Sequence, residues 1–330
     1  MEDIMKKFLT AGSTIALLAL AAVPASAADL KLLSSWNTDN WPTYAALDMF
    51  TKKVKSIGEG KVNISISGKE VVPPFEQLQP VSAGVFDMLY THGIYHAGSK
   101  GIAFTMDAVA PGAKKRRDAG LIDYIDKYYQ KHNNMKLLGL VANSNQGYHI
   151  FLKKPLTDGS FKGRKVRGTL SYHGVIRLLG GSPVVLPGGQ IYTALEKGVI
   201  DGAAWPAAGM LTMKHYEVAK FKVRPTFGTT NTGFWINLAK WKTLTKAEQG
   251  VLIEAAKQTE IEMPAEGDRI LAEESKTLEK FGVKETMLNA EMAAKVRATF
   301  SGDMWTIAQK CCSDGVKGLR ALAQKAGLSN

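Results

Sequence analysis

The chain has 330 residues, about twice the length of a typical domain, so we expect two domains or lobes. Its apolar fraction of 45% and its charged fraction of 22% are ordinary for a globular protein. With 32 glycines, 12 prolines and 2 cysteines, the composition excludes collagen, disordered proteins and disulfide scaffolds. The net charge of +12 favours anionic partners without identifying them.

The N-terminus indicates export. A lysine pair at 6–7 precedes an apolar run over 15–23, and Ala-Ser-Ala at 25–27 is typical of a cleavage site. We therefore predict a signal peptide over residues 1–27 and export of the mature chain, with Met5 as an alternative start. The run is too short for a membrane anchor, and the chain has no other run that approaches spanning length. Export also argues against nucleic acid as the anionic partner.

The mature sequence alternates short apolar strands with helices. We expect strands over 30–34, 62–67, 85–90, 137–141, 148–152, 165–167, 183–186 and 199–205. Helices are expected from Pro42 to about Phe50 and over 75–83, 121–131, 172–179 and 190–197. Strands separated by helices predict an α/β protein with mainly parallel sheets.

Two segments of the sequence resemble each other. Ala83–Asp87 reads Ala-Gly-Val-Phe-Asp, and Lys197–Asp201 reads Lys-Gly-Val-Ile-Asp. In each segment the glycine can adopt the left-handed conformation that ends a helix, directly before a strand. The similarity suggests two related lobes.

A long helix follows the second set of strands. Thr245 and Glu248 form a capping-box pattern, and the helical periodicity continues to Phe281. A proline and a glycine predict a kink near residues 263–267. We expect this helix to bridge both lobes. Two amphipathic helices are expected after it, over 291–305 and 315–326.

Common catalytic motifs are missing from the chain. It contains no GxSxG, no HExxH and no phosphate-binding glycine loop, which favours binding without chemistry. His92 and His96 have the spacing of a metal pair on a helix, but nearby glycines favour a loop. Cys311 and Cys312 are adjacent, so they are not an ordinary structural disulfide, and we assign them no function.

Arg167 is the strongest candidate for binding an anion. It ends a short predicted strand next to Gly168. In open α/β sheets, ligands bind in the crevice beyond the carboxyl ends of the strands. A guanidinium can hold a carboxylate there through two hydrogen bonds. The alternative is an ordinary surface arginine.

Motifs on both sides of Arg167 identify a family. The sequence closely resembles the extracytoplasmic solute receptors of tripartite ATP-independent periplasmic (TRAP) transporters. The segments that carry the resemblance are Leu186–Leu195 with Gly198–Gly202, Phe161–Gly163 with Val166–Arg167, Pro74–Glu76 with Ala83–Met88, and Asn231–Asn237 with Trp241.

The resemblance implies a two-lobed periplasmic binding protein whose hinged lobes close on a small organic carboxylate and deliver it to TRAP permease subunits. It implies no enzymatic activity. We expect lobe I over 28–142 and 230–262, lobe II over 143–229 and 263–310, and a C-terminal helical segment over 311–330.

The resemblance also suggests which residues bind the ligand. Arg167 matches the carboxylate-binding arginine, Trp205 an aromatic that packs on the acid, and Tyr95 a tyrosine near the cleft. Asn145 and Gln146 match amide ligands. Further candidates are His149, as a possible hydrogen-bond donor, and Phe75, Trp36, Asn231 and Phe234.

Two departures from the family pattern bear on the ligand. Many members have an arginine in a Gly-aromatic-Arg triplet, where this chain has His149. Members that bind 2-oxo or 2-hydroxy acids through a metal have an acidic residue where this chain has Ala204. We therefore expect no cofactor and a monocarboxylate with an apolar or aromatic body. The alternatives are a metal-assisted 2-oxo or 2-hydroxy acid receptor, a sensory receptor and a periplasmic enzyme.

Overall fold

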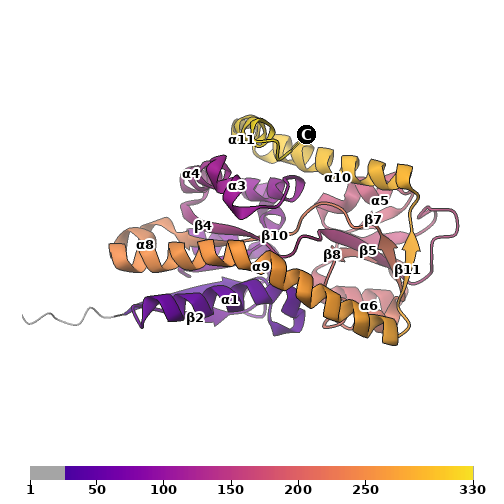
Figure 1. Cartoon of the computed structure of the whole chain (residues 1–330), viewed down its shortest axis with the longest axis horizontal. Coiled ribbons are helices and arrows are strands. Elements are labelled where there is room, and N and C mark those ends of the chain that lie inside the picture. Colours follow the sequence, from indigo (N-terminus) through magenta and orange to yellow (C-terminus); the bar gives the residue numbers. More distant parts are fainter. Residues whose placement is uncertain (1–26, 330) are drawn as a thin grey trace, which may run out of the picture.

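The computed structural model describes residues 27–329, which form two α/β lobes joined by long helices (Figure 1). The predicted signal peptide lies outside the described residues except for its last position. Each lobe consists of one sheet and the helices that pack on it.

Lobe I contains a five-stranded sheet with the order β2-β1-β3-β10-β4. Its strands are β1 (Ala28–Ser34), β2 (Val62–Ser67), β3 (Met88–Thr91), β4 (Met135–Ala142) and β10 (Asn231–Asn237). Its helices are α1 (Trp41–Gly58), α2 (Leu78–Ser82), α3 (Ala113–Asp118), α4 (Leu121–Asn133) and α8 (Leu238–Thr243).

Lobe II contains a six-stranded sheet with the order β11-β9-β5-β8-β6-β7. Its strands are β5 (Tyr148–Leu152), β6 (Lys165–Arg167), β7 (Ser182–Val184), β8 (Gly202–Pro206), β9 (Phe221–Arg224) and β11 (Lys284–Met287). Its helices are α5 (His173–Leu178), α6 (Ile191–Glu196) and α7 (His215–Val218). The chain passes from the sheet of lobe I to that of lobe II between β4 and β5, and it returns between β9 and β10.

Both sheets are mixed rather than wholly parallel. In lobe I, β10 runs antiparallel to β3 and β4, and in lobe II, β5 runs antiparallel to β8 and β9. The remaining pairs are parallel. Strand β5 is the first strand after the chain leaves lobe I, and β10 is the first strand after it leaves lobe II. Each sheet therefore contains an antiparallel strand that the chain forms on entering it from the other lobe.

The two similar sequence segments have the same local structure. Gly84 and Gly198 both have a left-handed backbone, with φ of 81° and 69°. Three residues later, Asp87 accepts a hydrogen bond from the backbone N–H of Lys31, and Asp201 accepts one from the N–H of Lys165, each at 2.8 Å. The lobes therefore share a helix–turn–strand unit, which supports their relation by an internal repeat.

Helix α9 (Lys246–Lys280) runs along both lobes and bends near its middle (Figure 1). Its capping box is formed as predicted, with Thr245 and Glu248 hydrogen-bonded reciprocally. Pro264 lies inside the helix, where it lacks the N–H that would continue the backbone ladder. One turn later, a Cβ on Gly267 would lie only 1.7 Å from the carbonyl oxygen of Asn143. The helix thus needs glycine where it crosses the connection between β4 and β5.

Two helices end the described chain. Helix α10 (Ala290–Cys311) packs on the 3-10 segments 93–99 and 102–108 of lobe I and on α5 of lobe II. Helix α11 (Ser313–Lys325) packs on α4. The adjacent Cys311 and Cys312 form a disulfide at the junction of the two helices. Within residues 27–329, no helix combines the length and the apolar character needed to cross a bilayer.

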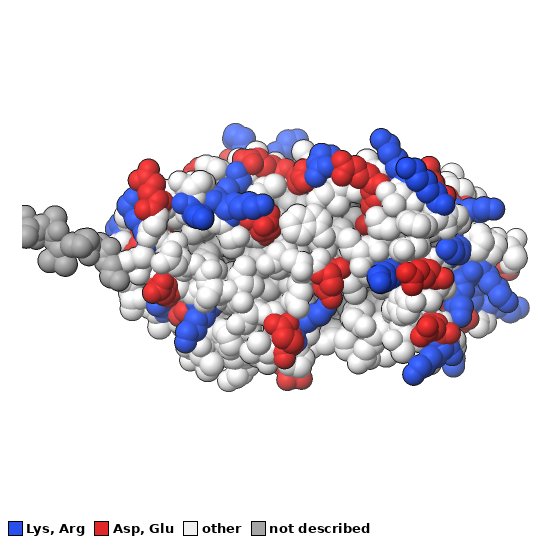
Figure 2. Space-filling model, turned by 90° about the horizontal axis from the view of Figure 1, so that it is seen from below, with Lys and Arg blue, Asp and Glu red and all other residues white. Residues whose placement is uncertain are grey.

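Charged side chains of both signs are interspersed on the surface. On the face shown in Figure 2, on the side of α1 and α6, lysines and arginines alternate with aspartates and glutamates. They do not gather into a basic patch on this face. The net positive charge is therefore spread over this side of the molecule rather than shaped into an anion-binding surface.

Candidate functional site

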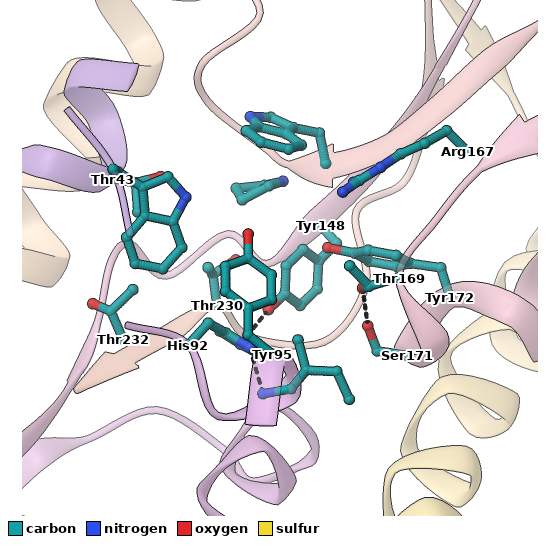
Figure 3. A pocket seen from close by; sticks show the side chains of 14 residues that line it. Thr43, His92, Tyr95, Tyr148, Arg167, Thr169, Ser171, Tyr172, Thr230 and Thr232 are labelled. Carbon is teal, nitrogen blue, oxygen red and sulfur yellow. Dashed lines mark hydrogen bonds between the residues drawn. The ribbon is translucent and has the colours of Figure 1, made fainter. Parts of the chain in front are cut away.

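A narrow cavity of about 30 Å³ lies between the lobes, enclosed by side chains from both. Lobe I and the segment that leads into β10 contribute one wall, and lobe II contributes the other (Figure 3). The lining residues are Trp36, Thr43, His92, Ile94, Tyr95, Tyr148, Arg167, Thr169, Ser171, Tyr172, Trp205, Pro206, Thr230 and Thr232.

Arg167 is the only Lys, Arg, Asp or Glu among these lining residues. It ends β6, is 1% exposed and points toward the middle of the cavity (Figure 3). Its Nε donates to the carbonyl oxygen of Leu186 at 2.9 Å and its Nη1 to that of Ala204 at 3.1 Å. Its Nη2 has no hydrogen-bond partner among residues 27–329. The two carbonyls hold the guanidinium in place and leave its outer edge open for a ligand.

The charge of Arg167 is not neutralised by the protein. Within residues 27–329, no carboxylate lies within 4 Å of the guanidinium. Burial lowers the pKa of Arg167, and the nearby hydroxyls of Tyr95 and Tyr172 oppose this shift. The indole of Trp205 lies 5.4 Å from the guanidinium carbon and provides a cation–π contact. A buried cation without an anion is costly, so the cavity favours an anionic ligand.

Neutral hydroxyl groups surround the guanidinium. Burial raises the pKa of Tyr95 and, more strongly, that of Tyr172, so both phenols remain protonated donors. Thr169 and Ser171 lie on the same wall and share a hydrogen bond of 2.9 Å. A carboxylate at Arg167 would thus find uncharged donors for the oxygen lone pairs that the guanidinium does not occupy.

His92 and Asp107 of lobe I form a buried network with Tyr148 of lobe II beside the cavity. The Oδ2 atom of Asp107 lies 2.9 Å from Nε2 of His92 and accepts a hydrogen bond of 2.6 Å from the hydroxyl of Tyr148. Nδ1 of His92 accepts from the N–H of Ile94, so the neutral ring carries its proton on Nε2 and donates it to Asp107. The network links lobe I to the first residue of β5.

A second buried arginine supports this network from behind. Arg116 donates to Oδ1 of Asn231 and to the carbonyl oxygens of Val109 and Ala110. Burial lowers its pKa to about 10, and Asp107 opposes the shift. Asn231 in turn donates to Oδ1 of Asp107 at 3.0 Å. The charge of Asp107 is therefore matched within the protein, unlike that of Arg167.

Five of the ten predicted site residues line the interlobe space. Arg167, Trp205, Tyr95 and Trp36 line the narrow cavity, and Phe75 lines a larger cavity of about 280 Å³ next to it. Their contact with a ligand stays a prediction.

The structure does not bring the two predicted amides to the cavity. Asn145 donates to both carboxylate oxygens of Asp268 on α9, once through its backbone and once through its side chain. Oε1 of Gln146 accepts from the hydroxyl of Thr226. Both residues lie in the segment between β4 and β5. Asn145 links this segment to α9, and Gln146 links it to the segment between β9 and β10.

Three further candidates lie outside the cavity lining. His149 is buried behind it, with Nδ1 3.2 Å from Arg224, and burial holds its pKa well below the usual value. Asn231 is occupied by Arg116 and Asp107, as described above. Phe234 is in the core of lobe I, stacked between Phe50 and Tyr90 at 4.2 and 4.9 Å. Placing these side chains against the ligand is not supported by the structure.

Sequence patterns had not singled out several lining residues. The prediction named His149, but alternation along β5 turns Tyr148 and not His149 to the cavity. His92 does line the cavity, but Nε2 of His96 lies 3.3 Å from the hydroxyl of Thr91 instead. In the described part of the chain, no three side chains of His, Cys, Asp or Glu gather as metal ligands.

Comparisons with known proteins agree with this architecture. A monocarboxylate 2-oxoacid-binding periplasmic protein of Nostoc sp. is 28% identical over 180 residues, covering 51% of this chain and 49% of that protein. An uncharacterized protein of Haemophilus influenzae is 37% identical over 99 residues, covering 29% of this chain and 30% of that protein. The chain thus spans about half, or less, of the length of these relatives.

Solved structures match over nearly the whole chain. A TRAP periplasmic solute-binding protein of Desulfovibrio salexigens with bound orotic acid has a TM-score of 0.79 at 19% identity, covering 90% of this chain and 98% of that one. A TRAP transporter solute-binding protein of Bordetella bronchiseptica with calcium and picolinate has a TM-score of 0.76 at 22% identity, covering 91% of each chain. At these identities the likeness shows the fold, which is the predicted two-lobed one. The family model for bacterial extracellular solute-binding proteins of family 7, DctP, matches residues 33–310, and the chain belongs to this family.

Proposed function

We propose that this protein is a periplasmic receptor that binds an organic acid between its lobes and delivers it to a TRAP permease. The observation that carries the proposal is the buried, unneutralised guanidinium of Arg167, whose Nη2 has no partner. A ligand carboxylate would neutralise this charge when the lobes close on it. Because the ligand then stabilises the closed form over the open one, binding and closure are coupled.

The charges around the cavity support a ligand with a single carboxylate. Arg167 can neutralise one anionic group on the lobe II side. On the lobe I side, the nearest charged group behind His92 and Tyr148 is the carboxylate of Asp107. Among residues 27–329, no Lys or Arg lines the cavity on that side, so a second ligand carboxylate would lack a cationic partner. The curated relative from Nostoc is described as binding monocarboxylate 2-oxoacids, which is consistent with this assignment.

Titration calorimetry with paired acids tests this function. We expect acids with one carboxylate to bind at least about tenfold more tightly than C4-dicarboxylates of similar size, because the second charge stays unpaired in a buried site. Recovery of the acid unchanged after long incubation, measured by mass spectrometry, is expected of a receptor without enzymatic activity. Equal or tighter binding of the dicarboxylates would contradict the single-anchor assignment.

We also propose that the ligand binds without a metal ion. Calcium accompanies picolinate in the protein of Bordetella bronchiseptica, but Ala204 offers no carboxylate beside Trp205 in this chain. Treatment with a chelator is therefore expected to change the dissociation constant by less than about twofold, and added calcium should not restore or increase binding. A tenfold loss that calcium reverses would show that a metal bridges the acid to the protein.

A further inference from the structure

The interlobe space consists of two compartments of very different size. The inner one, around Arg167, has about 30 Å³, which is the volume of one or two water molecules. The outer one has about 280 Å³. Trp36, Tyr95 and Trp205 line both compartments, so the two adjoin at these three rings. A carboxylate group fits the inner compartment, but the body of an organic acid does not.

Equivalent segments of the two lobes form the walls of the outer compartment. In lobe I, Pro73 precedes the 3-10 turn Pro74–Glu76, and in lobe II, Pro187 precedes the 3-10 turn Gly188–Gln190. The second residue after the leading proline is Phe75 in lobe I and Gly189 in lobe II. The repeat is thus asymmetric at this position, because one lobe supplies an aromatic ring and the other supplies bare backbone.

The glycines of lobe II keep this wall open. A Cβ on Gly188 would lie 2.6 Å from Cη2 of Trp205, so the indole packs directly on the backbone of Gly188. A Cβ on Gly189 would meet no atom within 4 Å. Since Gly189 lines the outer compartment and does not need a left-handed backbone, its missing side chain leaves room for a ligand.

The aromatic side chains that line the outer compartment are suited to a flat, apolar group. Phe75 is 39% exposed and packs edge-on against Tyr95, with ring centroids 4.8 Å apart. The ring centroids of Trp36 and Tyr95 are 5.7 Å apart. The one charged lining side chain, Lys69, is paired with Asp39. A planar tail would cover the exposed ring of Phe75 and needs no charge of its own.

We propose that the ligand is an elongated monocarboxylate, with its carboxylate in the inner compartment and an aromatic or conjugated planar tail between Phe75 and the Gly188–Gly189 backbone. This inference rests on the proposed function and specifies its substrate class. It predicts that discrimination among acids is made in the outer compartment, whereas Arg167 provides the anchor common to all of them.

The test uses pairs of acids that share a head group and differ only in a ring, such as propionate and 3-phenylpropionate, or pyruvate and phenylpyruvate. Calorimetry on the wild-type protein is expected to show the ring-bearing member binding at least about tenfold more tightly in the best pair. Gly189→Leu fills the outer compartment and should remove this advantage, while it leaves the dissociation constant of the short member within about threefold. Phe75→Ala should also reduce the advantage of the ring-bearing member.

Matched substitutions away from the cleft serve as controls. Gly302→Leu is on α10, where an added Cβ also has open space, and Phe281→Ala removes another half-exposed ring. Neither should alter the preference for rings. Tightest binding by the short acids, or an unchanged preference in Gly189→Leu, would overturn the inference and leave the proposed function intact. Failure of every acid to bind would overturn both.

Discussion

Replacing Arg167 with alanine is expected to weaken binding of the acid by about 30-fold or more. The side chain is buried, and its open edge meets the cavity, so the substitution leaves a ligand carboxylate desolvated and without its partner. Loss of one member of such a buried pair costs about 2–5 kcal/mol of binding free energy, which corresponds to about 30- to several thousand-fold in affinity. Calorimetry with the tightest acid from the panel measures the effect.

Two further variants separate the anchor from general effects on the fold. Arg167→Lys keeps the charge but not the planar fork, so we expect it to recover only part of the lost affinity. Arg164→Ala removes an arginine three residues earlier that donates only to the surface carbonyls of Lys154 and Pro155, and it should bind as the wild type does. If Arg167→Ala binds as tightly as Arg164→Ala, the carboxylate is held elsewhere.

The strand and turn next to Arg167 could be predicted from the sequence because they depend on residues close together in the chain. Strand β6 spans Lys165–Arg167, as predicted, and Gly168 follows it directly. The helix–turn–strand unit at Gly198–Asp201 follows from chemistry that acts over a few residues. Such features need no knowledge of the partner lobe.

The prediction that Phe234 binds the ligand failed because it depends on how far along β10 the side chain lies. Thr230, Thr232 and Phe234 alternate onto the same face of the β10 segment, and the two threonines line the cavity. Phe234 is farther from the crossing, so it packs under Phe50 of α1 instead. A period of two indicates the face of a strand but not how far along it the cavity ends.

The network of His92, Asp107 and Tyr148 could not be predicted from sequence patterns for a different reason. Asp107 is 15 residues from His92 and 41 from Tyr148. The three side chains meet only because the end of β3, the 3-10 segment 102–108 and the start of β5 lie together where the chain passes between the lobes. None of these spacings matches a known motif. The size of the two compartments likewise depends on how the lobes are packed, which local patterns do not specify.

The second large effect that we expect is a loss of stability in acid. His215 is completely buried against Phe151, both of its ring nitrogens lack partners, and burial lowers its pKa to about 3. Burial likewise lowers the pKa of His96 to about 3 and that of His149 well below its usual value. In the unfolded chain these groups have a pKa of about 6.5. Below that pH the unfolded state therefore binds protons that the folded state does not, and the free energy of unfolding falls as the pH decreases.

Each of these histidines should cost about 1.4 kcal/mol per pH unit between about pH 6 and the folded pKa, or about 2 kcal/mol at pH 5 relative to pH 7. Glu260 and Glu274 change the free energy of unfolding in the opposite direction. Burial raises their pKa, so as the pH falls the folded state binds their protons at a higher pH than the unfolded state does. Melting by calorimetry at pH 7.5 and pH 5.0 should show a clear decrease in Tm for the wild type.

His215→Phe isolates one of these contributions. Phenylalanine can keep the stacking on Phe151 and has no nitrogen to protonate, so we expect nearly unchanged stability at pH 7.5 and a loss in acid that is smaller by about 2 kcal/mol. Met213→Leu, a nearby substitution without a titrating group, should retain the full wild-type loss. Were His215→Phe to lose as much stability as Met213→Leu between the two pH values, the folded protein must protonate His215 without cost, and its burial could not be the source of the acid sensitivity.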